Sequence, residues 1–145
     1  IVCLSGPPLT IGVENPTAVY DYVWTAPDGS NIIGSEITIS SGGLYTVTAT
    51  TTNGTGCTRT SEIQVNESSI ATITDNDVTI VDDSDNNSIT IDPTNLGIGD
   101  YEYALIDQDG QLSSFQQDPV FENLLGGFYT IVVQDKNGCR PNAEL

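Results

Sequence analysis

Three short stretches of the chain collect oxygen-bearing side chains. They are 75–77 (DND), 82–87 (DDSDNN) and 107–110 (DQDG), and the first two flank the apolar run 78–81 (VTIV). Calcium is bound by roughly six to eight hard oxygen atoms, which clustered Asp and Asn side chains on loops can supply. Calcium is therefore the candidate cofactor, and its candidate ligands are Asp75, Asp77, Asp82, Asp83, Asp85 and Asn87.

The same residues have a second interpretation. Asp83, Asp85 and Asn87 have the spacing of the first ligands of an EF-hand loop, but an EF-hand would place Gly at position 88 and Glu at position 94, where this chain has Ser and Thr. Asp, Asn and Gly are also the residues that favour turns. The sequence therefore leaves two alternatives open, a calcium loop and a set of ordinary turns.

The residue types that catalysis needs are scarce. The chain has no His, so it lacks the commonest general base and metal ligand, and a Ser-His-Asp or Cys-His arrangement is excluded. Pairs of carboxylates could serve a glycosidase, but the acids lie mainly in expected turns, where nothing would raise the pKa of one above another. We therefore expect that the protein is not an enzyme.

The charge excludes further classes of function. The formal net charge is −17, from 20 acidic residues against Arg59, Lys136 and Arg140. Such a chain is repelled by phosphate backbones and by anionic lipid surfaces, so we expect no nucleic-acid partner. No apolar run approaches the length of a membrane span, so membrane insertion is not expected either.

A repeat indicates how the chain is organised. GGLYTVTATTTNGTGC at 42–57 returns as GGFYTIVVQDKNGC at 126–139, which predicts two domains, 1–67 and 68–145. Alternating apolar residues bounded by turn residues predict β-strands throughout and no helix. The expected strands are 9–13, 19–25, 36–39, 44–51 and 59–65 in the first half, and 78–81, 88–92, 100–106, 119–122 and 128–134 in the second.

The alternation also indicates the core. Tyr45, Val47 and Ala49 fall on one face of a strand, and Tyr129 occupies the place of Tyr45 in the second copy. Tyr22-x-Trp24 aligns with Tyr101-x-Tyr103, each before an Asp-Gly turn. Trp24 and Tyr103 are therefore the expected large aromatic residues at the centre of two sandwiches, and Tyr45 is expected to bond its hydroxyl back to the backbone, as in a tyrosine corner.

These residues carry a resemblance. Tyr22-x-Trp24, Gly43-x-Tyr45-Thr46-Val47, Asn53-Gly54 and Cys57, with Cys3 before them, resemble an immunoglobulin-like or PKD-like surface module. The second half, with Tyr101-x-Tyr103, Gly127-x-Tyr129-Thr130 and the stretch 135–139 (DKNGC), is similar to repeats of Bacteroidetes gliding-motility-associated adhesins exported by type IX secretion. The expected fold is all-β, as two tandem immunoglobulin-like (PKD-like) β-sandwich domains.

The resemblance implies a function and a location. It implies a non-catalytic stalk or adhesion module at the bacterial outer cell surface, which spaces or presents a functional domain. Neighbouring modules of the same chain or of other subunits, or a surface glycan or protein, would be its partners. The alternative is a carbohydrate-binding accessory module of a secreted glycan-degrading enzyme. A sugar binder would expose a platform of coplanar rings, whereas a stalk would bury Trp24, Tyr45, Tyr103 and Tyr129.

The same resemblance suggests how the cysteines pair. Cys3 and Cys57 fall at opposite ends of the first module, where a disulfide would close it, and an exported location would permit the bond. Cys139 is then left over, either as a free thiol or with a partner beyond Leu145.

The end of the second module suggests an interaction surface. A strand follows Cys57 at 59–65, but only six residues follow Cys139, and one of them is Pro141. We therefore expect the last strand of this module to be shortened or missing. The neighbouring strand would then expose an edge at Tyr129, Ile131 and Val133 that invites strand addition.

Overall fold

The computed structural model covers the whole chain and describes residues 1–83 and 86–145. The described chain is all-β, apart from two three-residue 3-10 segments, η1 (Asp75–Asp77) and η2 (Pro93–Asn95). Neither segment is long enough to cross a membrane, and no other helix is present in the described ranges. The chain divides into two compact units, Ile1–Glu67 and Ser68–Leu145.

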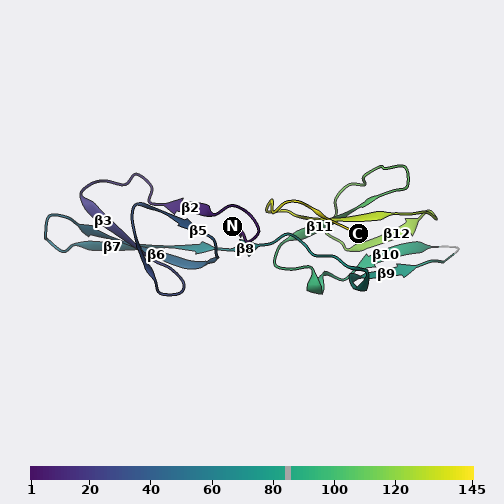
Figure 1. Ribbon diagram of the computed structural model, residues 1–145, viewed down its shortest axis with the longest axis horizontal. Helices are drawn as coiled ribbons and strands as arrows, with labels where there is room; N and C mark the ends of the chain where they lie inside the picture. Colours follow the sequence, from purple (N-terminus) through teal and green to yellow (C-terminus); the bar gives the residue numbers. More distant parts are fainter. Residues whose placement is uncertain (84–85) are drawn as a thin grey trace. The chain divides into compact units, whose positions relative to one another are not determined.

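The first unit is built from two main sheets. Strand order in the larger sheet is β4-β3-β6-β7, and β2 pairs with β5 in the smaller one (Figure 1). A short pair, β1 with β8, joins the two ends of this segment. The strands are β1 (Val2–Cys3), β2 (Leu9–Gly12), β3 (Tyr20–Thr25), β4 (Asn31–Ile33), β5 (Glu36–Ile39), β6 (Gly43–Thr51), β7 (Thr58–Val65) and β8 (Glu67–Ser68).

The core of the first unit lies between these sheets. Ile11, Ile37 and Ile39 of the smaller sheet belong to one buried cluster with Trp24 and Tyr45 of the larger sheet. Both aromatic side chains are 3% exposed, as the alternation predicts. Burying a large apolar side chain stabilises a fold by roughly 1.5–3 kcal/mol, so these two rings are a substantial part of what holds a unit of this size together.

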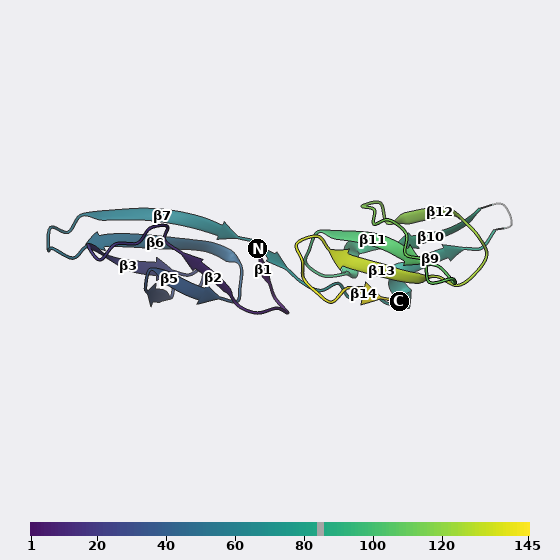
Figure 2. The ribbon, with the colours of Figure 1, turned by 90° about the horizontal axis from the view of Figure 1, so that it is seen from above.

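The second unit has the same design. One sheet has the order β12-β10-β9 and the other β11-β13-β14 (Figure 2). Its buried cluster draws Ile89, Ile91 and Phe121 from the first sheet and Tyr103, Leu105, Ile131 and Val133 from the second. The strands are β9 (Val78–Val81), β10 (Asn87–Ile91), β11 (Tyr101–Ile106), β12 (Val120–Leu124), β13 (Thr130–Asp135) and β14 (Ala143–Glu144). The protein is thus two tandem immunoglobulin-like β-sandwiches.

The repeated Gly-Gly-x-Tyr motif forms the same corner in both units. The hydroxyl of Tyr45 donates to the carbonyl oxygen of Ser41 at 2.9 Å, and that of Tyr129 donates to the carbonyl oxygen of Leu125 at 3.0 Å. Each bond spans four residues backward, which is the geometry of a tyrosine corner. The motif therefore repeats a structural element of the fold.

The second glycine of the motif is also explained by packing. A Cβ at Gly43 would lie 2.4 Å from Cγ of Pro27, and a Cβ at Gly127 would lie 2.8 Å from Oε1 of Gln108. Pro27 and Gln108 each directly precede the Asp-Gly turn of their unit. Gly43 also has φ of +128°, a conformation that L side chains rarely adopt.

The register of the two units corrects one expectation. In the first unit, Trp24 pairs with Val47, which lies two residues after the corner tyrosine Tyr45. In the second unit, the residue two positions after the corner tyrosine Tyr129 is Ile131, and it pairs with Leu105. Trp24 also lies three residues before Pro27, as Leu105 does before Gln108. The place of Trp24 is therefore taken by Leu105, and Tyr103 lies two residues away. A shift of two residues keeps the same face, so Tyr103 is buried as expected.

Candidate functional site

The second unit contains an open groove of about 480 Å³ beside strand β9. Its walls come from β9, from the β12–β13 connection and from the end of the chain. The apolar residues that line it are Val78, Ile80, Val81, Ile89, Leu124, Leu125, Phe128, Tyr129, Ile131 and Leu145. We call this feature the β9 groove.

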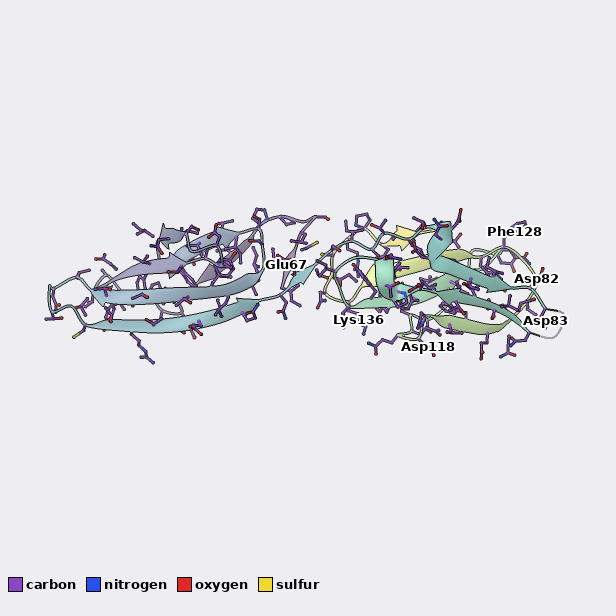
Figure 3. All side chains as sticks on the ribbon, turned by 90° about the horizontal axis from the view of Figure 1, so that it is seen from below. Glu67, Asp82, Asp83, Asp118, Phe128 and Lys136 are labelled. Atoms are coloured by element: carbon purple, nitrogen blue, oxygen red, sulfur yellow. The ribbon has the colours of Figure 1, made fainter. Side chains whose placement is uncertain are left out.

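The groove is apolar and open to solvent. The side chains of Ile80, Leu125 and Phe128 are 70%, 82% and 88% exposed, and those of Val81 and Leu145 are exposed as well. Clustered exposed apolar side chains of this size mark an interaction site more often than singly scattered ones do. Figure 3 shows Phe128 at the same end of the second unit as Asp82 and Asp83.

The groove opens into the interior of the sandwich. Ile80 pairs with Ile89, and Val78 pairs with Ile91, so the side chains of each pair lie on the same face of the sheet. Ile89 and Ile91 are buried in the core, whereas Ile80 remains exposed because β9 is the edge strand of its sheet in the part of the chain that the structure describes. Ile89 and Ile131, one from each sheet, are the core residues that the groove reaches.

The rim of the groove is acidic. Asp75 and Asp82 are among its lining residues, one at each end of β9. Asp82 and Asp83 lie where β9 leaves the sheet, and Lys136 lies toward the other end of the unit (Figure 3). Lys136 is bound to Asp100 at 3.2 Å, and Arg140 donates to the backbone oxygen of Asp135. The cations of the second unit are thus engaged away from the groove.

The predicted calcium ligands do not come together at one place. Asp75 and Asp77 precede β9, and Asp82 and Asp83 follow it. At roughly 3.4 Å per residue, the strand separates Asp77 from Asp82 by on the order of 15 Å, too far for one ion. Among the described residues, no group of three or more acidic or Cys side chains is placed to hold a metal. The structure therefore does not bring Asp75 and Asp77 together with Asp82 and Asp83 around one ion.

Several of these side chains have structural roles instead. Asp77 is buried, and its Oδ2 accepts hydrogen bonds from the backbone N–H of Thr74 at 2.9 Å and from its hydroxyl at 2.7 Å. Asn87 donates to the carbonyl oxygen of Leu124 and accepts from the backbone N–H of Asp83. Asp85 lies outside the described residues. Calcium binding that involves Asp85 stays a prediction.

The edge that the sequence predicted at the end of the second unit is not free in the structure. The last strand is short, as expected, since β14 has two residues. However, β14 pairs with Val132 and Val133, and Ile131 exchanges backbone hydrogen bonds of 2.9 and 3.1 Å with Leu145. Strand β13 is therefore paired on both sides at these positions. Ile131 and Val133 are core residues, and Tyr129 is half-buried beside the groove.

The disulfide expectation is wrong. Cys57 is a free, exposed thiol, whereas Cys3 and Cys139 are each disulfide-bonded. Cys57 lies in the turn between β6 and β7, where Thr51 N–H donates to its carbonyl oxygen, whereas Cys3 belongs to β1. Cys3 and Cys57 lie at the two ends of the first module in sequence, but they do not form a disulfide with each other.

A pair of neighbouring tyrosines, one exposed and one half-buried, lies in the first unit. Tyr20 and Tyr22 have ring centroids 6.4 Å apart, with their planes tilted by 51°. The hydroxyl of Tyr22 accepts a hydrogen bond from the backbone N–H of Thr17 at 3.0 Å. These two rings are not coplanar, so they do not form the flat platform expected of a sugar binder.

Comparisons with known proteins add little to this description. No protein-family model and no curated protein matches the chain. Among solved structures, domains 3 and 4 of rat CD4 are similar over 97% of this chain and 94% of that chain, at 10% sequence identity and a TM-score of 0.33. The assignment of the fold therefore comes from the strand order, the buried Trp24 and the two tyrosine corners.

The β9 groove was not predicted from the sequence. Its main apolar residues lie in the run VTIV, which was expected to be an ordinary strand, and in the loop LLGGF, which is 124–128. The available signal was that Leu125 and Phe128 are large apolar residues beside two glycines of a turn, where a core residue is not expected.

Proposed function

We propose that the protein is a non-catalytic, extracellular stalk or adhesion module of an exported bacterial surface protein. The observation that carries this proposal is that Cys3 and Cys139 are disulfide-bonded, since such bonds persist in oxidising compartments and are rare in the cytosol. The immunoglobulin-like sandwiches support it, because this architecture serves as a spacer or an interaction module in many cell-surface proteins.

The burial of the predicted aromatic residues favours this role over carbohydrate binding. Trp24, Tyr45 and Tyr103 are each less than 5% exposed, so their rings are core rather than a platform. The hydroxyl of Tyr129 donates to the carbonyl oxygen of Leu125, so this side chain forms the tyrosine corner of the second unit. A carbohydrate-binding module would require other rings, and the tilted pair Tyr20 and Tyr22 is one candidate surface for that alternative.

The free thiol of Cys57 provides a direct test of location. A membrane-impermeant maleimide is added to intact cells that produce the full-length host protein, and the label is mapped by mass spectrometry. Surface exposure predicts that Cys57 is labelled without lysis and that a Cys57→Ser variant takes up no label on this segment. Labelling that appears only after lysis would contradict the extracellular location.

The alternative is tested separately by a glycan microarray. The stalk role predicts no bound glycan, with Tyr20→Ala indistinguishable from the parent protein. A glycan that binds the parent and is lost in the Tyr20→Ala variant would favour a carbohydrate-binding module.

A further inference from the structure

The backbone of β9 has a free edge that faces the β9 groove. Asp92 N–H donates to the carbonyl oxygen of Asp77, and the register pairs Val78 with Ile91 and Ile80 with Ile89. Hydrogen-bonded and non-hydrogen-bonded pairs alternate in an antiparallel ladder, so Thr79 and Val81 bond to β10, and Val78 and Ile80 turn their backbone groups outward.

The hydrogen bonds between β10 and β12 lead to the same assignment of inward and outward backbone groups. Ile91 N–H donates to the carbonyl oxygen of Pro119, so Ile89 and Ile91 direct their backbone groups toward β12, away from β9. At the outer edge, the N–H of Val78 is taken by the carbonyl oxygen of Asp75. Within the described ranges, Ile80 has no backbone hydrogen bond outside the β9–β10 ladder. Its N–H and C=O, with the C=O of Val78, form an open docking point.

We propose that the β9 groove binds an extended, basic strand of a partner protein, which pairs with Ile80 at the free edge of β9. Such a strand would extend the sheet β12-β10-β9 by one member. Its alternate side chains would then point between the two sheets, where Tyr129, Ile131 and Leu145 line the groove, and the others would point to solvent. The backbone supplies affinity, and the groove selects apolar residues at every second position.

Charge decides which kind of strand fits. Asp75 and Asp82 lie at the two ends of the edge, and the chain as a whole carries a formal charge of −17. A second copy of this protein would bring the same charge to the acidic rim, so a self-associated strand is disfavoured. A strand with Lys or Arg at its solvent-facing positions would be attracted to the rim and oriented by it. Strand binding here is independent of the cellular location proposed above.

The test uses the whole two-unit protein and a short synthetic peptide of alternating lysine and valine. Amide hydrogen exchange is followed by NMR with and without the peptide. A paired strand would protect the outward N–H of Ile80, slowing its exchange by about tenfold or more, and would leave the N–H groups of Thr79 and Val81, already in the ladder, nearly unchanged. This alternation separates strand pairing from simple occupation of the groove by an apolar molecule.

Two controls accompany the measurement. Ile80→Pro removes the outward N–H without removing a bond to β10, and Pro is tolerated at an edge strand in that orientation. It should weaken peptide binding by about tenfold, whereas Ile80→Val, which keeps the N–H and an apolar side chain, should bind within about twofold of the parent. A peptide in which glutamate replaces lysine should not bind, and Asp75→Asn combined with Asp82→Asn should weaken the lysine peptide and lower its dependence on salt.

Each contrary result overturns a stated part of the proposal. Failure of the lysine peptide to bind at millimolar concentration rejects the docking site. Binding without protection of Ile80 means that the groove takes apolar groups but no strand. Equal binding of the glutamate peptide rejects the basic partner. Protection of Ile80 in the protein alone, with a dimer in sedimentation, assigns the edge to a second copy.

Discussion

The hydroxyl of Tyr45 donates a hydrogen bond of 2.9 Å to the carbonyl oxygen of Ser41. The ring of Tyr45 lies in the core of the first unit, and its hydroxyl ties the start of β6 to the preceding turn. The side chain therefore contributes in two separable ways, through buried apolar area and through one directed bond.

Removing the hydroxyl alone should have a moderate effect. Tyr45→Phe keeps the ring and leaves the carbonyl of Ser41 without this donor, so the free energy of unfolding of the first unit should fall by about 1 kcal/mol. Tyr45→Ala also removes the ring and should cost about 3–5 kcal/mol. Urea unfolding followed by Trp24 fluorescence reports on this unit, because Trp24 is the only Trp of the chain. Equal losses for the two variants would contradict a core position of the ring.

Trp24 should be shielded from solvent quenchers. Its side chain is 3% exposed, and its Nε1 donates to the carbonyl oxygen of Gly34 at 3.0 Å. Iodide should therefore quench the fluorescence of the folded protein only weakly and quench the urea-unfolded chain strongly. Acrylamide, which is uncharged, serves as the control, since iodide is also repelled by the negative chain. Strong quenching of the folded protein by acrylamide would place Trp24 at the surface.

The strands of both sandwiches were predictable because their apolar residues alternate. All ten expected strands are present, with ends that differ by at most two residues. The short strands β1, β4 and β8 were not expected, because two or three residues carry no periodicity. The register of Tyr103 was missed for a related reason. A shift of two residues leaves the alternation unchanged, so the pattern could not distinguish Tyr103 from Leu105 as the residue of the second unit that is equivalent to Trp24.

The candidate site was less predictable because it depends on contacts that are distant in sequence. The β9 groove brings Ile80 together with Phe128 and Leu145, which lie in three separate segments. Whether β9 is an edge strand is set by the order of the sheet, which the sequence of β9 does not contain. The disulfide is a similar case, since the three cysteines permit three pairings and their spacing favoured the wrong one.

Cys57 should be the one reactive thiol of the chain. It is free and exposed, and Cys3 and Cys139 are disulfide-bonded. Alkylation under denaturing, non-reducing conditions should modify one thiol per chain, and peptide mapping after cleavage at acidic residues should locate the label on Cys57. Cys57→Ser should show no reactive thiol. A label on Cys139, together with a cross-linked peptide containing Cys3 and Cys57, would restore the pairing expected from the sequence.

Asp135 should make the second unit sensitive to acid. Its carboxylate is 1% exposed and accepts hydrogen bonds from the hydroxyl of Ser68 at 2.7 Å and from the backbone N–H of Cys139 at 3.0 Å. Burial by itself would raise the pKa of Asp135, but the bonds from Cys139, Ser68 and Asn137 outweigh it and hold the pKa below its ordinary value. The charged form is therefore favoured in the folded state.

The sign of the pH dependence follows from this lowered pKa. An unfolded Asp titrates near about 3.9, so the stabilisation is fully present above that pH and is lost as the pH falls through the lower pKa of the folded state. Asp135→Asn should remove this part of the acid sensitivity. It should also cost about 1–3 kcal/mol at neutral pH, because an amide cannot satisfy all of the buried donors that face the carboxylate.

Asp92→Asn is the matched control for Asp135. Hydrogen bonds from the Thr94 hydroxyl and backbone N–H also lower the pKa of Asp92, but its carboxylate is exposed. Its replacement should change stability far less. Unfolding of the second unit is followed by hydrogen exchange of the Ile131 and Val133 amides between neutral pH and pH 3. If Asp135→Asn and Asp92→Asn lose the same free energy, the buried hydrogen-bond network around Asp135 is not what stabilises the second unit.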